Sequence, residues 1–91
     1  NDGYNDVLNI YCKSDTPGKM INIVIYDAKG RQIKYLVRNQ LMSNESVYTW
    51  DGITEGNQKA NVGIYIVYVE MLGLDGKVEG FKKATVLATK L

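Results

Sequence analysis

The chain has 91 residues, which is enough for one domain that folds alone with little stability to spare. Its 11 Lys and Arg residues nearly balance its 10 Asp and Glu residues, and a net charge of +1 excludes the strong positive field on which nucleic-acid binding depends. No apolar run approaches the roughly 18 residues of a membrane span. The chain starts at Asn1 without a signal peptide, and we expect it to be a piece of a longer protein.

The cysteine and histidine counts limit the chemistry that the chain can perform. With no histidine, Ser-His-Asp and Cys-His arrangements are excluded, and so are zinc sites built on histidine. The one cysteine, Cys12, cannot form an intrachain disulfide, and we expect it to be a small packed residue of the first strand. A catalytic carboxylate pair remains possible, but the Asp and Glu residues are spread through turns and strand ends. We therefore expect no enzymatic activity, no catalytic residues and no cofactor.

The first third of the chain reads as a loop followed by two strands. Turn-forming residues dominate 1–6, which we expect to be an entry loop to a single domain over 7–91. Alternating residues predict a first strand over 7–13 and a second over 19–26, in which three isoleucines share one face. Residues 27–30 form a predicted hairpin turn, with a glycine at the positive-φ position.

The returning strand over 31–38 breaks its own alternation. Ile33 and Tyr35 alternate, but Leu36 falls out of phase, and a bulge near Tyr35 would place both Ile33 and Leu36 in the core. Residues 39–44 are predicted to be a connection in which Leu41 and Met42 fold over one end of the core.

Trp50 and the segment that follows it organise the second half. Trp50 closes a strand over 45–50, where it shares a face with Tyr48, and Asp51-Gly52 begins a polar loop. The next strand, over 63–72, is apolar on both faces, which predicts a central strand covered on both sides or nearly so.

A second hairpin turn at 73–76 leads to a last strand over 77–91, interrupted at Gly80. Six or seven antiparallel strands with no helix predict an all-β fold, an Ig-like β-sandwich. The residues expected to converge between its two sheets are Ile21, Ile23, Ile25, Trp50, Tyr65, Val67 and Val69.

Several of these segments carry a family resemblance. The run Ile-Asn-Ile-Val-Ile-Tyr-Asp-Ala-Lys-Gly-Arg-Gln-Ile at 21–33, Tyr-Thr-Trp-Asp-Gly at 48–52 and Gly-Ile-Tyr at 63–65 resemble the small Ig-like domain shared by the flagellar hook-capping protein and many exported bacterial enzymes. The chain is also similar to C-terminal sorting and anchoring domains of Bacteroidetes secreted proteins, including the gliding-motility-associated kind. The resemblance implies an exported protein at the cell surface, in the outer membrane or outside the cell.

Three candidate sites have structural alternatives. Asp2, Asn5 and Asp6 can supply oxygen ligands to calcium, but a turn bonded to its own backbone explains them better, and we expect no metal. Trp50 and Asp51 can mark a ligand site, but we expect Trp50 to plug one end of the sandwich and Asp51 to accept hydrogen bonds from loop N–H groups. The seven tyrosines can form a sugar-stacking face, although core and cross-strand packing explains most of them; they are Tyr4, Tyr11, Tyr26, Tyr35, Tyr48, Tyr65 and Tyr68.

Two functions remain open. The first is a non-catalytic C-terminal accessory domain that acts in sorting, anchoring or spacing, with other domains of the parent protein and secretion or cell-surface machinery as partners. The second is a module that binds carbohydrate or protein through a sheet face or the end loops. An exposed row of two or three aromatic rings would favour the binding module, and a smooth polar exterior would favour the accessory domain.

Overall fold

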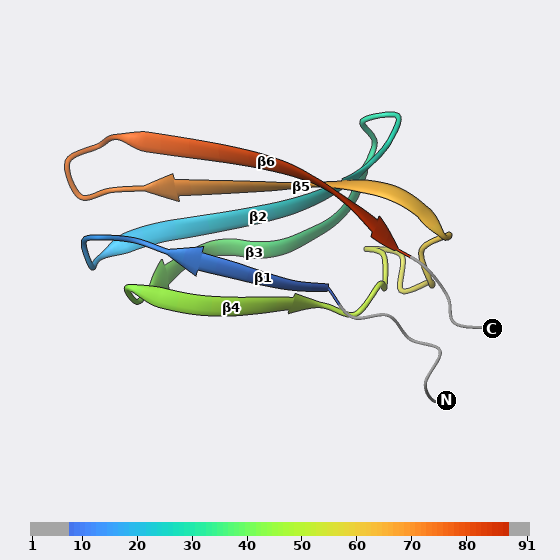
Figure 1. The fold of residues 1–91 in the computed structure, drawn as a ribbon, viewed down its shortest axis with the longest axis horizontal. Coiled ribbons are helices and arrows are strands. Elements are labelled where there is room, and N and C mark those ends of the chain that lie inside the picture. The colour runs from blue at the N-terminus through green and yellow to red at the C-terminus, as the bar shows by residue number, and fades with distance from the viewer. Residues whose placement is uncertain (1–7, 88–91) are drawn as a thin grey trace.

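The computed structural model describes residues 8–87, which form an all-β sandwich of six antiparallel strands and no helix (Figure 1). This confirms the expected fold class. The strands are β1 (Leu8–Lys13), β2 (Lys19–Asp27), β3 (Gln32–Met42), β4 (Glu45–Trp50), β5 (Gly63–Leu72) and β6 (Val78–Leu87).

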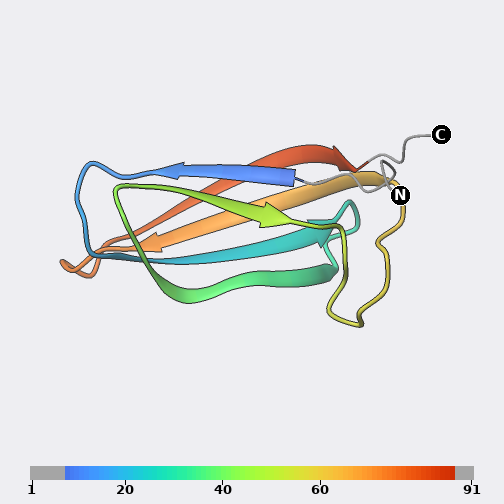
Figure 2. The same ribbon diagram turned by 90° about the horizontal axis from the view of Figure 1, so that it is seen from below.

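The two sheets differ in width. One contains β1 and β4, and the other has the order β3-β2-β5-β6, with β2 and β5 in its centre. Tight hairpins join β2 to β3 and β5 to β6, and Gly30 and Gly76 supply the positive φ of 86° and 83° that these turns require. Figures 1 and 2 show β1 and β4 side by side along one face of the wider sheet. A two-stranded layer therefore covers a four-stranded one.

The core lies between the sheets and contains every residue that the sequence placed there. The three isoleucines of β2 and Trp50 of β4 are fully buried. Alternate residues of β5 complete the layer at 5–8% exposure, as a half-buried strand of period two requires. The buried cluster also includes residues outside that set of seven: Cys12, Val37, Met42, Met71 and Leu87.

Strand β3 carries the expected bulge. Val24 pairs with Tyr35 while its neighbour Ile23 pairs with Val37, so Leu36 is an extra residue in β3. Ile33 and Leu36 both pack against the buried cluster, as predicted. Two further register shifts occur along the β2–β3 pair, and Asn39 adopts a φ of 45° beside one of them.

The connection predicted at 39–44 is wrong. Residues 39–42 continue β3, because Leu41 and Met42 pair with Met20 and Lys19, and only 43–44 lie between the strands. Met42 is 2% exposed and closes the core, but Leu41 is 72% exposed on the other face of the sheet. The bulges shift the alternation, which hides this part of the strand in the sequence.

The prediction that β5 is covered on both sides is also wrong. The strand is central, but Ile64 on its second face is 56% exposed and Leu72 is 40% exposed. Within residues 8–87, the narrow sheet covers only the face that carries Tyr65 and Val67. The other face, called here the outer face, has no second layer in the described part of the chain.

Gly80 does not interrupt the last strand. It pairs with Glu70 within an unbroken register of ten pairs between β5 and β6. A Cβ at this position would lie 2.6 Å from the Tyr68 hydroxyl oxygen, so the glycine makes room for the tyrosine that lies against it. The predicted end of this strand, from residue 88, lies outside the described residues.

Candidate binding surfaces

Trp50 is a structural anchor. It is fully buried, its ring packs edge-on against Tyr65 with centroids 5.4 Å apart, and its Nε1–H donates to the Ile53 carbonyl at 3.0 Å. The Tyr65 hydroxyl donates to the Asn61 carbonyl at 2.6 Å. These two aromatic side chains tie both arms of the 51–62 loop to the core, so the prediction that Trp50 plugs one end of the sandwich is confirmed.

Asp51 also serves the loop, as predicted. Its Oδ1 accepts a hydrogen bond from the Ile53 N–H at 3.0 Å, across the turn in which Gly52 has a φ of 80°. Asp51 is exposed, so this bond orders the turn and leaves no buried donor dependent on it.

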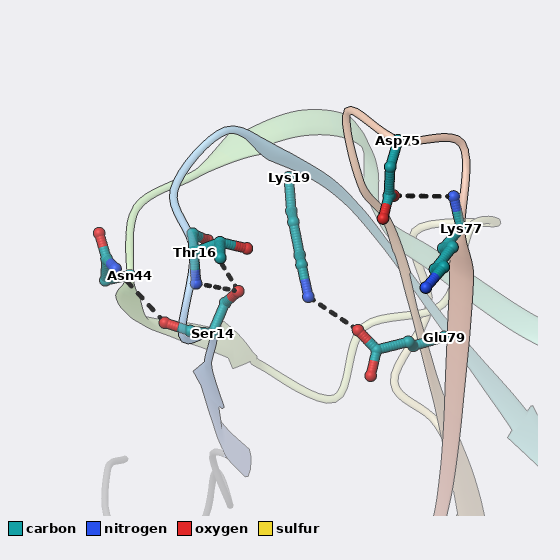
Figure 3. Close-up of polar contacts among 7 residues, drawn as sticks. All are labelled: Ser14, Thr16, Lys19, Asn44, Asp75, Lys77 and Glu79. Carbon is teal, nitrogen blue, oxygen red and sulfur yellow. Dashed lines mark hydrogen bonds and ion pairs between the residues drawn. The ribbon is translucent and has the colours of Figure 1, made fainter.

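The other turn aspartates are used in the same way. Asp27 accepts hydrogen bonds from the Lys29 and Arg31 N–H groups and from the Arg31 side chain; the backbone bond from Arg31 is the main cause that lowers the pKa of the Asp27 carboxyl. Asp75 accepts from the Lys77 N–H at the opposite end (Figure 3). These three carboxylates stabilise turns and do not converge.

An ion pair joins β2 to β6, the two strands that flank β5, on the inner face at that same end. Lys19 Nζ of β2 lies 2.7 Å from Glu79 Oε1 of β6, and Figure 3 shows the two side chains meeting beside the β5–β6 turn. The lysine side chain is 19% exposed, so the pair is partly shielded from water.

Cys12 is a packed residue, as predicted. It is 4% exposed on the inner face of β1, and burial raises the pKa of its thiol. A thiol in this setting is poorly nucleophilic.

A groove opens between β1 and β6, where the narrow sheet stops short of the wider one. Its volume is about 300 Å³; its floor is formed by Val67 and Val69 of the core, and its walls by Leu8 and Ile10 on one side and by Phe81, Lys83 and Thr85 on the other. Phe81 is 51% exposed although it lies on the core-facing side of β6, directly opposite Val69. This feature, called here the open groove, was not predicted.

The sequence did contain a signal for the groove. By alternation along the last strand, Phe81, Lys83, Thr85 and Leu87 fall on one face. An ionised lysine is not buried without a partner, so its presence among core-facing positions indicates that the covering layer is missing there.

The outer face carries three of the tyrosines. Val24 lies between Tyr35 and Tyr68 in the cross-strand register. It is only 7% exposed although the described part of the chain places no second layer over it, so the neighbouring side chains shield it. Tyr35 is fully engaged: its hydroxyl donates to Asn22 at 3.0 Å, and the Arg38 guanidinium lies 4.0 Å from its ring centroid.

Two tyrosines of the outer face border a hollow. Tyr26 and Tyr68 line it with Ile66, Gly30 and Lys82, and its volume is about 430 Å³. Both tyrosines are half-buried, so their rings are partly accessible from this side. The hollow thus combines aromatic surface, an aliphatic side chain and one ammonium group.

The remaining candidate residues do not join either surface. Tyr65 is buried and Tyr48 packs against the core. Tyr11 is the exception: it is 78% exposed on the narrow sheet and is among the residues that line the open groove. Asp2, Asn5, Asp6 and Tyr4 lie outside the described residues. Within 8–87, no group of three or more His, Cys, Asp or Glu side chains is placed to hold a metal ion.

No protein-family model matches the chain, and comparisons with curated proteins and with solved structures return no match either. Among residues 8–87 there is no helix long and apolar enough to cross a membrane.

Proposed function

We propose that this chain is a non-catalytic C-terminal accessory domain of an exported or cell-surface bacterial protein, acting in sorting, anchoring or spacing. The sequence resemblance supports this role. The observation that carries it in the structure is that its turn aspartates bond backbone N–H groups and do not converge on a site. Asp27, Asp51 and Asp75 are used to hold turns, whereas large apolar side chains are left exposed on sheet faces.

Those exposed side chains suit attachment to protein. The outer face presents Leu41, Ile64, Leu72, Val78 and Val86 at 40–72% exposure. Scattered apolar residues are normal on any surface, but these five share one face of one sheet. They form two groups at its two ends: Leu72 pairs with Val78 next to the Met20–Leu41 pair, and Ile64 pairs with Val86. Such a face fits a domain that packs against its neighbours in a longer chain or in an assembly.

The test is deletion of residues 7–91 from the parent protein in its own bacterium. The accessory role predicts that the purified truncated protein keeps its main activity, while its export, surface retention or stability is impaired. If the truncated protein is exported and retained normally but no longer binds a polysaccharide or a partner, the accessory role is wrong and the binding module replaces it.

Carbohydrate binding is the second candidate, favoured by the hollow at Tyr26 and Tyr68. The outer face is not the smooth polar exterior that was expected to favour the accessory domain, because it exposes large apolar side chains. Tyrosine rings can stack on sugars, and Lys82 would favour acidic ones. Affinity electrophoresis in alginate and in neutral dextran tests this: Tyr26→Ala and Tyr68→Ala should abolish retardation by alginate. Tyr11→Ala, which changes an exposed tyrosine of the other sheet, is the matched control.

A further inference from the structure

The open groove lies beside a free strand edge. Within residues 8–87, β1 pairs with β4 only, so its other edge presents backbone N–H and C=O groups toward the groove without a strand partner. Such an edge is a template for one more strand. A strand added there would lie about 4.8 Å from β1 and directly above the exposed inner face of β6.

The side chains of the groove match an added strand. Strand residues alternate between faces, so every second side chain of the added strand would point toward Val67, Val69 and Phe81. Burying these positions would cover the half-exposed Phe81 and complete the layer that the narrow sheet leaves unfinished. The incoming strand therefore needs apolar residues at alternate positions.

The charged side chains of the groove indicate which polar residue the added strand should carry. Lys82 and Lys83 are among the described residues that line it, and no acidic side chain is among them. Lys83 lies on the same face as Phe81, opposite Val67. A carboxylate among the inward-pointing residues of the added strand would pair with this ammonium group.

A second copy of this chain cannot supply the added strand by pairing its own β1 with this β1. Antiparallel pairing of two β1 edges about a two-fold axis turns both inner faces the same way. Each copy's β6, which extends beyond β1 beneath the groove, would then occupy the space of the other. The groove has room for one extended segment, but not for a strand that is covered by a wide sheet of its own.

We propose that the open groove binds one extended β-strand from a partner protein, about six residues long, with alternating apolar side chains and an acidic residue facing Lys83. This inference rests on the proposed accessory function and specifies how the domain would attach. The strand pairs with the free edge of β1 and fills the space above Phe81.

The test uses the whole chain and a capped synthetic peptide about seven residues long, which alternates valine with threonine and has one valine replaced by glutamate. Its control has the same composition with the valines placed together. Binding is measured by fluorescence anisotropy and mapped by amide chemical shifts. We expect the alternating peptide to bind and to shift the amides of Leu8–Lys13 and Val78–Leu87. Equal binding of the control peptide, no binding at about 1 mM, or shifts confined to the outer face would overturn the proposal.

Two substitutions sharpen the test. Phe81→Asp should abolish binding of the alternating peptide. Lys83→Glu should weaken its binding about fivefold, as expected for one exposed charge pair. A second peptide, with lysine in place of the glutamate, should recover the affinity for the Lys83→Glu variant. Val86→Asp is the control, because Val86 lies on the outer face of the same strand and is 69% exposed; it should leave the affinity for both peptides unchanged. If the groove variants bind and are retained like the wild type while deletion of residues 7–91 impairs retention, the groove proposal fails and the accessory function stands.

Discussion

Replacing Trp50 with alanine should be among the most damaging single changes in this domain. The side chain is fully buried, it packs edge-on against Tyr65, and its N–H satisfies the Ile53 carbonyl. Truncating a buried aromatic residue typically costs about 3–5 kcal/mol, which includes the cavity left behind. A domain of this length has a total stability of about 5–14 kcal/mol. The substitution therefore removes a large part of the stability and loosens the 51–62 loop.

Urea denaturation followed by far-ultraviolet circular dichroism measures this loss without depending on the tryptophan itself. Trp50→Phe is the matched control, because it keeps a ring beside Tyr65 but cannot bond the Ile53 carbonyl; we expect it to cost about 1–3 kcal/mol. A loss below about 1 kcal/mol for Trp50→Ala would refute the reasoning, since it would mean that the core closes without this side chain.

Three further predictions concern polar and thiol groups. Asp51→Ala should lower the stability by about 0.5–1.5 kcal/mol through loss of one exposed turn hydrogen bond; an unchanged melting temperature would reopen a functional role for the carboxylate. Because the pKa of Asp27 is lower in the folded state than its ordinary value of 3.8, its carboxylate stabilises the fold at neutral pH, and this contribution disappears as the pH falls through the folded pKa. Asp27→Asn should thus be less stable than the wild type at neutral pH, and urea titrations at decreasing pH should show the difference closing; a constant difference would contradict this. Native Cys12 should react with a thiol reagent only slowly and become reactive in urea, whereas rapid labelling of the folded protein would show that the wide sheet does not cover its thiol.

The predictable parts of the structure were those where local pattern and packing agree. Alternating isoleucines located β2, and the phase slip at Leu36 located a bulge, because both follow from which side chains a pleated strand can bury. The function of Trp50 and Asp51 in the loop also followed from residue type and position.

The predictions that were wrong concern which layer, if any, covers a given face of a strand. Ile64 and Leu72 look like core residues in the sequence, yet they are exposed because the second sheet, as far as residues 8–87 describe it, has two strands and covers one face. The open groove was missed for the same reason, since the edge at which a covering layer stops is a property of the assembled sheets. Only Lys83, a charge among core-facing positions, indicated it.

The two edges of the wide sheet are unequal, and this limits self-association. β3 carries three register irregularities along its pairing with β2, whereas β6 keeps a continuous register with β5 over ten pairs. A bulged strand edge is a poor template for pairing with a strand of another copy, while a regular edge is a good one. Two copies that joined their β6 edges would form one continuous sheet with β3 at both ends. Because β3 is a poor template at both ends, we expect growth along this sheet to stop at a pair.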